Sequence, residues 1–131
     1  MRKLIVFALA LVCFSACQKS IEDRAEQEAR EYTEKLCPTP VQNFTRTDSL
    51  TFARSTRTFS YYSTVVGAAD SPEMIRNVSG QLHSELLKSI QQSTQLKTYK
   101  EEGFSFRYII RSEKNPTQVL DEVTFTPKDY Q

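Results

Sequence analysis

The sequence contains few of the residues that build most catalytic and metal centres. Its 131 residues include no Trp, one His, three Cys and three Gly. Three scattered glycines cannot form a glycine-rich phosphate loop, and a single histidine with scattered acids has no metal-ligand spacing, so we expect no metal and no cofactor. The formal net charge of +1 offers no excess of positive charge for nucleic acid. No window approaches the roughly 20 apolar residues that a transmembrane helix needs.

The longest apolar run lies at the N-terminus and is too short to span a bilayer. Arg2 and Lys3 precede an apolar segment, residues 4–12, and this arrangement is typical of a secretory signal peptide. We therefore exclude residues 1–16 from the fold. The ordinary globular composition of the remainder predicts one domain over residues 17–131.

Two small residues stand directly before a cysteine at the end of this segment. The run Phe14-Ser15-Ala16-Cys17 resembles a bacterial lipobox. The resemblance implies that Cys17 is lipidated and that the chain is anchored in the cell envelope, in the outer membrane because Gln18 rather than Asp follows. Phe14 departs from the usual aliphatic residue, so an ordinary cleaved signal peptide and an uncleaved anchor are alternatives.

Lipidation of Cys17 and loss of Cys13 with the signal peptide would leave Cys37 as the only free thiol. No disulfide within the chain is then expected. Cys37 can be a small buried hydrophobe or can pair between two chains.

Two segments have the apolar spacing of amphipathic helices. Residues 20–36 start at the capping residue Ser20 and end before Pro38, either packed on the domain or as a solvated stalk. Residues 72–92 follow a Ser71-Pro72 start signal. Their expected buried stripe is Ile75, Val78, Leu82, Leu86 and Ile90. Gly80 within this helix suggests close packing on a sheet.

Four segments indicate strands. Residues 41–66 are rich in β-branched and aromatic residues, with a turn near residues 54–56, and residues 104–111 and 119–125 form a second pair. The order helix-strand-strand-helix-strand-strand predicts a two-layer α+β fold in which two helices cover one face of an antiparallel four-stranded sheet. The exposed face should be polar, with Thr45, Thr47, Ser49, Thr51, Arg107 and Arg111.

Several short motifs of the mature chain resemble a family of small exported bacterial lipoproteins. They are Cys37-Pro38, Thr47-Asp48-Ser49, Tyr61-Tyr62, the run from Gly103 to Tyr108, and Thr126-Pro127-Lys128-Asp129-Tyr130. That family has no assigned activity, so the resemblance implies the fold and the cellular address and assigns no functional residue.

The sequence favours a noncatalytic envelope lipoprotein that acts as an accessory or protein-interaction module, bound to the membrane and to an envelope protein partner. A small-ligand or glycan binder is the alternative, and the candidate surface for either is Arg107, Arg111, Tyr62 and Tyr99.

A small envelope hydrolase that uses His83 or Cys37 is the second alternative, although no nucleophile elbow is present. Glu101 and Glu102 are adjacent, so on an extended chain they point apart and do not form a glycosidase pair. Asp48-Ser49-Leu50 resembles a bacterial O-glycosylation acceptor, which would place a glycan on Ser49.

Overall fold

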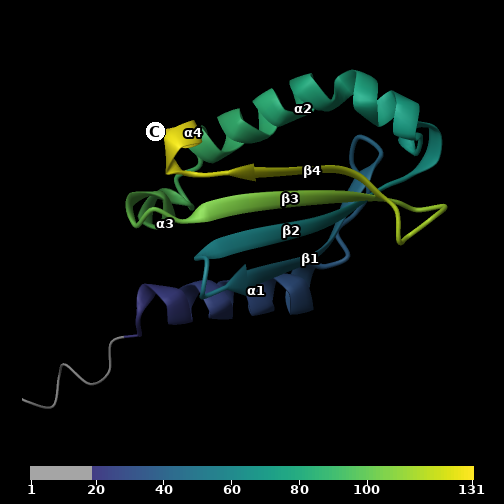
Figure 1. The fold of residues 1–131 in the computed structure, drawn as a ribbon. Helices are drawn as coiled ribbons and strands as arrows, with labels where there is room; N and C mark the ends of the chain where they lie inside the picture. The colour runs from purple at the N-terminus through teal and green to yellow at the C-terminus, as the bar shows by residue number, and fades with distance from the viewer. Residues whose placement is uncertain (1–18) are drawn as a thin grey trace, which may run out of the picture.

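Four strands form one sheet in the order β1-β2-β3-β4 (Figure 1). The computed structural model describes residues 19–131, so the signal peptide and Cys17 lie outside the described residues. The strands are β1 (Thr45–Ala53), β2 (Thr58–Val65), β3 (Ser105–Ser112) and β4 (Val119–Phe125). Strands β1 and β2 lie inside the predicted segment 41–66, and β4 coincides with the predicted segment 119–125. Strand β3 is shifted by one residue from the predicted segment 104–111.

Two long helices flank the sheet, α1 (Ile21–Leu36) beside β1 and α2 (Pro72–Gln92) beside β4 (Figure 1). The hydroxyls of Ser20 and Ser71 accept hydrogen bonds from the first-turn amides, as the capping signals predict. Two short helices, α3 (Lys97–Glu101) and α4 (Pro127–Tyr130), and the 3₁₀ turn η2 (Gly67–Ala69) were not expected. No helix among residues 19–131 is long and apolar enough to cross a membrane.

The expectation of a purely antiparallel sheet is wrong, because the central strands β2 and β3 run parallel. The β1–β2 and β3–β4 pairs are antiparallel. The 21 residues of α2 cover about 32 Å at 1.5 Å per residue, enough to carry the chain back along the whole of an eight-residue strand. A strand that follows such a return must run parallel to the strand before it, so the sheet is mixed.

A β-bulge in β1 also changes the expected polar face. Thr47 pairs with Ser63 but Ser49 pairs with Tyr62, so Asp48 is an extra residue. Because side chains alternate between faces, this insertion places Thr47 on the side that the helices cover and Ser49 on the outer side. The alternating Thr and Ser run is therefore divided between two faces, with Thr45 and Thr47 inside and Ser49 and Thr51 outside.

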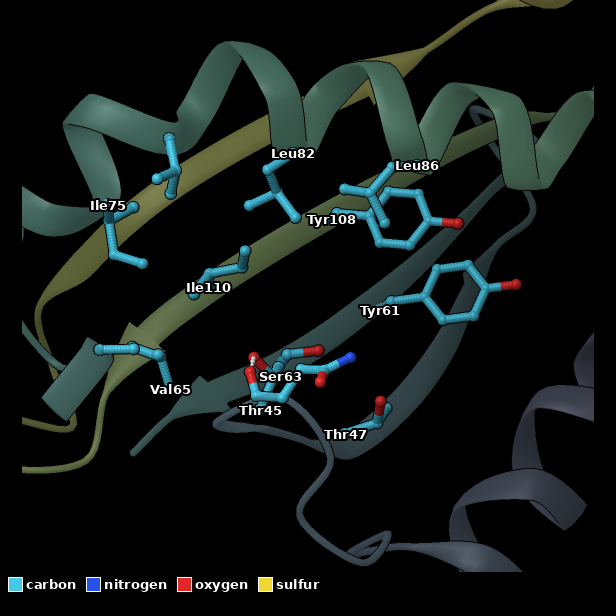
Figure 2. Close-up of a pocket in the computed structure, with 13 residues that line it drawn as sticks. Thr45, Thr47, Tyr61, Ser63, Val65, Ile75, Leu82, Leu86, Tyr108 and Ile110 are labelled. Atoms are coloured by element: carbon cyan, nitrogen blue, oxygen red, sulfur yellow. Dashed lines mark hydrogen bonds between the residues drawn. The ribbon is translucent and has the colours of Figure 1, made fainter. Parts of the chain in front are cut away.

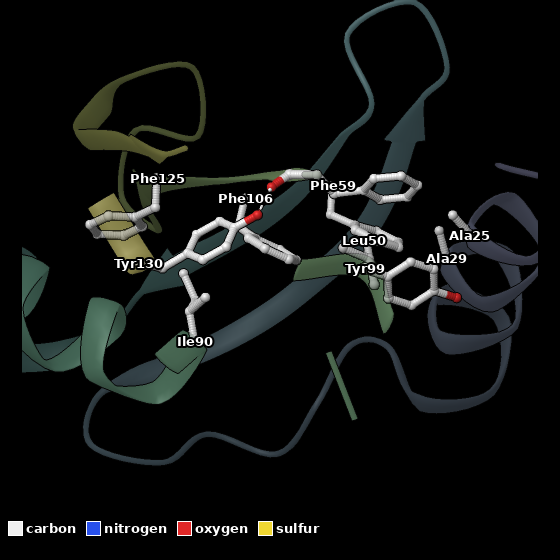
Figure 3. Close-up of a cluster of buried hydrophobic side chains, with 10 residues drawn as sticks. Ala25, Ala29, Leu50, Phe59, Ile90, Tyr99, Phe106, Phe125 and Tyr130 are labelled. Atoms are coloured by element: carbon white, nitrogen blue, oxygen red, sulfur yellow. Dashed lines mark hydrogen bonds between the residues drawn. The ribbon is translucent and has the colours of Figure 1, made fainter. Parts of the chain in front are cut away.

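The main core lies at one end of the sheet, where α1 begins and α2 ends (Figure 3). Phe59 of β2 and Phe106 of β3 stack with ring centroids 6.0 Å apart. Ile90 of α2 and Phe104, which directly precedes β3, are also fully buried. The Tyr130 hydroxyl of α4 donates to the main-chain oxygen of Phe104 at 2.7 Å. The short C-terminal helix thus closes this core.

The outer edge of β1 is paired with side chains and loop backbone. The Thr33 hydroxyl of α1 donates to the Leu50 carbonyl and accepts from the Leu50 amide, both at 2.9 Å. The Thr39 amide donates to the Thr47 carbonyl, and the Thr39 hydroxyl accepts from the Thr47 amide. These contacts confirm that the first helix packs on the domain and satisfy an edge that is otherwise open to pairing.

Candidate functional site

A groove of about 350 Å³ opens over the helix-covered face of the sheet (Figure 2). Tyr61 and Ser63 of β2 with Tyr108 and Ile110 of β3 form its floor. One wall is apolar and consists of Val78, Leu82 and Leu86 of α2, and the opposite side consists of Thr45 and Thr47 of β1. A second hollow, which shares Thr45 and Thr47 with the groove, lies beside Tyr32 of α1. The groove therefore has an aliphatic side and a hydroxyl-rich side.

The groove exists because α2 touches the sheet at its ends more closely than along its middle. Ile75 and Ile90 are 6% and 1% exposed, but Val78 is 43% exposed. Leu82 and Leu86 are half-buried and line the groove. The expected buried stripe is thus confirmed at Ile75 and Ile90, is partly buried at Leu82 and Leu86, and is wrong at Val78.

Gly80 does not mark a close approach to the sheet. A Cβ built at Gly80 meets no atom within 4 Å. The glycine is exposed, so the expectation of close packing there is wrong.

Two stacked tyrosines give the groove floor its polar character. The rings of Tyr61 and Tyr108 are 4.8 Å apart and nearly parallel, at 7°. Burial raises the pKa of Tyr61 to about 12, with smaller contributions from Tyr32 and Glu28, and burial also raises the pKa of Tyr108. Both phenols are protonated at neutral pH, so each can donate a hydrogen bond to a bound group.

One polar contact joins the middle of α2 to the sheet. His83 Nε2 lies 2.8 Å from Asp121 Oδ2 of β4. The contact lies on the side of α2 that faces β4. His83 is therefore held in a pair that fastens the helix to the edge strand.

The outer face of the sheet brings together three of the four residues expected to form a binding surface. Tyr62 lies opposite Ile109, and Arg107 and Arg111 flank Ile109 on the same face. The Arg111 guanidinium lies 5.5 Å from the Tyr62 ring centre, and Arg107 pairs with Glu122 at 2.7 Å. Ile109 is only 2% exposed, because these long side chains cover it.

Tyr99, the fourth of these residues, cannot belong to a surface. It lies in α3, is 2% exposed and packs edge-to-face on Phe59. Tyr99 is therefore a core residue. Ser49, the expected glycosylation acceptor, lies half-buried on the outer face.

The candidate catalytic residues of a hydrolase do not lie together in the structure. Cys37 follows α1 on the β1 side of the sheet, whereas His83 faces β4 at the opposite edge. Burial, and secondarily the charge of Asp48, raise the pKa of the Cys37 thiol, which keeps it in its less reactive protonated form. Glu101 and Glu102 are both exposed where α3 ends. Within residues 19–131 no group of three or more His, Cys, Asp or Glu side chains is placed to hold a metal ion.

A family model covers most of the described domain. The model described as a domain of unknown function, DUF8479, matches residues 20–121. This chain belongs to that family. The match spans both long helices and strands β1 to β3 and ends within β4, so it includes every residue that lines the groove. None of the curated proteins compared with the sequence matches it.

Three solved structures are similar to this DUF8479 chain. A candidate secreted protein of Pseudomonas aeruginosa has a TM-score of 0.67 at 14% identity, over 87% of this chain and 100% of that one. The type II secretion pilotin EpsS of Vibrio vulnificus has a TM-score of 0.62 at 11% identity, over 84% and 91%. The pilotin AspS of Vibrio cholerae has a TM-score of 0.60 at 15% identity, over 82% and 90%. At these identities the likeness establishes a shared fold.

The groove contains none of the four residues that the sequence indicated as a binding surface. Leu82 and Leu86 were expected to be core residues, and Thr45 and Thr47 were expected on the outer face. The bulge at Asp48 and the overhang of α2 bring these side chains together. A signal was nevertheless present, because a 21-residue helix between two strands indicates a crossover and hence a parallel central pair.

Proposed function

We propose that this protein is a noncatalytic accessory protein of the cell envelope that holds an amphipathic helix of a partner protein in the groove. The groove is the observation that supports this function. It combines the aliphatic wall of α2 with the hydroxyls of Tyr61, Tyr108, Thr47 and Ser63, and this is the pairing that an amphipathic segment needs. The shared fold with two type II secretion pilotins supports an accessory role.

The width of the sheet favours a helix as the bound segment. Neighbouring strands are about 4.8 Å apart, so β1 and β4 are separated by about 14 Å. The two long helices lie beside those outer strands, whereas helices in direct contact pack at about 8–10 Å. The central strands β2 and β3 therefore have room above them for much of a third helix.

The proposed anchor is the lipid on Cys17. Several acyl chains on one residue hold a protein on a membrane without a transmembrane helix, at about 0.8 kcal/mol per buried methylene group. With only Gln18 and Lys19 between Cys17 and the capping residue Ser20, the folded domain would lie directly at the bilayer surface. The proposed location is the cell envelope, at the outer membrane.

The test is chemical cross-linking of the lipidated protein in its own membrane, followed by affinity capture and mass spectrometry. We expect one specific envelope protein to be captured. Leu86→Glu places a charge on the apolar wall of the groove and should abolish capture. Thr124→Glu adds the same charge on the outer face of β4, where Thr124 pairs with Arg107, and should leave capture unchanged.

The Cys17→Ala protein is the control for the anchor. Loss of the partner with this variant would support the lipidated location, and equal capture would contradict the lipobox assignment. Retention of the partner by Leu86→Glu would contradict the groove as the binding site.

Glycan binding on the outer face is less well supported by the geometry. A sugar ring would need the exposed face of Tyr62 for stacking, but the Arg111 guanidinium already lies over that ring. Thermal-shift measurements with envelope sugars test this alternative, and a stabilisation removed by Tyr62→Ala would establish it in place of the groove.

A further inference from the structure

The most exposed large apolar side chains among residues 19–131 gather toward one end of the molecule. Two ends can be defined along the strands. The anchor end holds the start of α1, the turn at residues 54–57, α3 and α4, and ion pairs of Arg54 with Asp23 and of Arg57 with Glu22 join the first two of these. The far end holds the end of α1, the loop at residues 37–44, η2 and the turn at residues 113–118 (Figure 1).

The six large apolar residues that are most exposed within residues 19–131 all lie toward the far end. They are Leu36, Val41, Phe44, Met74, Val78 and Val119. The anchor end, by contrast, exposes polar and charged side chains such as Ser55, Thr56, Lys97 and Lys128. The molecule is therefore polarised along the strand direction.

Three of these residues, Phe44, Met74 and Val78, form what we call the distal rim of the groove. Val78 is both exposed and part of the groove wall, and Met74 lies one turn before it on α2. Asn43, the neighbour of Phe44, lines the groove from the opposite side. Met74 and Val78 are thus continuous with the apolar wall, and Phe44 lies next to a residue of the opposite side.

The backbone holds Phe44 in an exposed position at some cost. Its φ of 61° lies in the left-handed region, which is rare for a bulky side chain, and Asn43 beside it has a φ of 51°. The Phe44 carbonyl accepts from the Val66 amide at 2.8 Å, and the ring lies beside Gly67. Strain of this kind persists where the surrounding structure fixes a residue for a role.

The short tether favours a protein over the bilayer as the occupant of the distal rim. From Cys17 to Ser20 the chain spans three residues, or about 11 Å when extended. The nine residues of β1 span about 30 Å between the two ends. A lipid on Cys17 would hold the anchor end near the membrane, and with the strands upright Phe44, next to the start of β1, would lie about 30 Å from it.

We propose that the distal rim is a docking surface for the partner helix, which enters the groove from the end that faces away from the membrane. This inference rests on the proposed function and adds the direction of approach and the residues of first contact. The partner segment carries large apolar side chains at helical spacing that continue beyond the groove onto Phe44 and Met74. Its connecting chain leads away from the outer membrane.

The test uses the full lipidated protein in its own cells, with the photo-crosslinking residue p-benzoylphenylalanine placed singly at four positions. Phe44 samples the distal rim and Leu86 the groove interior. Ser55 samples the anchor end, and Tyr62 the outer face. We expect adducts from Phe44 and Leu86 on one partner segment, several residues apart along it, and no adduct with that segment from Ser55 or Tyr62.

The other outcomes distinguish failure of the distal rim from failure of the proposed function. Adducts from Leu86 without adducts from Phe44 would overturn the distal rim while the proposed function stands. Adducts from Phe44 to phospholipid would show that the rim meets the bilayer. No protein adduct from either position would overturn both proposals.

A second measurement tests the orientation without a partner. The lipidated Cys37→Ser protein, labelled with a fluorophore at a cysteine in place of Thr56 or Thr117, is placed in phosphatidylethanolamine and phosphatidylglycerol vesicles that contain a headgroup spin-labelled quencher. We expect strong quenching at position 56 and several-fold weaker quenching at position 117. Equal quenching, or the reverse order, would overturn the orientation.

Discussion

Shortening two apolar side chains of α2 to alanine, one buried and one at the groove, tests whether the helix overhangs a groove. Ile90→Ala removes three carbons from a side chain that is 1% exposed. At about 0.8 kcal/mol per carbon group, with a further contribution from the cavity left behind, the variant should lose about 3 kcal/mol of unfolding free energy.

Val78→Ala should cost far less, although Val78 belongs to the same apolar stripe. Its two methyl groups are 43% exposed, so their burial contributes about 0.9 kcal/mol, of which the better helix propensity of Ala offsets about 0.5 kcal/mol. The expected net loss is about 0.5 kcal/mol, roughly one sixth of that for Ile90→Ala.

The assay is urea unfolding of both variants in the unlipidated Cys17→Ala background, followed by circular dichroism. A change of midpoint at constant slope reports the stability difference. If Val78→Ala and Ile90→Ala lose similar free energies, α2 is packed along its whole length. The groove, and with it the proposed helix site, would then be refuted.

Two further changes test contacts that fix the surroundings of the groove. Thr33→Val keeps the shape of the side chain but removes both hydrogen bonds to Leu50, so we expect a loss of about 1–3 kcal/mol and faster hydrogen exchange of the Leu50 amide, and unchanged exchange would contradict the edge contact. The Ser112 hydroxyl and the Lys114 amide hold the pKa of Asp70 below its ordinary value of 3.8. Its ionised form therefore stabilises the fold above about pH 4, and this stabilisation is lost as the pH falls through the lowered folded-state pKa. Asp70→Asn should be less stable than the parent at pH 7, and the difference should shrink in acid unfolding titrations; a difference independent of pH would contradict the assignment.

Local signals predicted the secondary structure well, because each depends on a few neighbouring residues. Ser20 and Ser71 cap the two long helices as expected, and Pro72 opens α2. The strand expected over residues 104–111 corresponds to β3, and Arg107 and Arg111 lie on its outer face as expected. Such patterns report the period of the backbone, and a distant contact seldom changes that period.

Strand direction and register depend on the whole chain and were predicted less well. The parallel pairing of β2 and β3 follows from where α2 delivers the chain, which no single strand sequence records. The bulge at Asp48 is a one-residue event, yet it moves Thr45 and Thr47 to the covered face. The polar side of the groove was therefore assigned to the wrong surface.

The apolar stripe of α2 shows why a binding face is hard to separate from a core in one sequence. Leu82 and Leu86 have the same spacing and chemistry as Ile75 and Ile90, because burial against a sheet and burial against a partner helix select the same side chains. What distinguishes them is the width of the sheet. Two helices placed beside strands β1 and β4 leave the central strands open, so Leu82 and Leu86 are only partly buried against the core and line the groove. An apolar helix stripe that its own sheet covers only in part is therefore an indication of docking. Val78 is the residue of this stripe that is left most exposed.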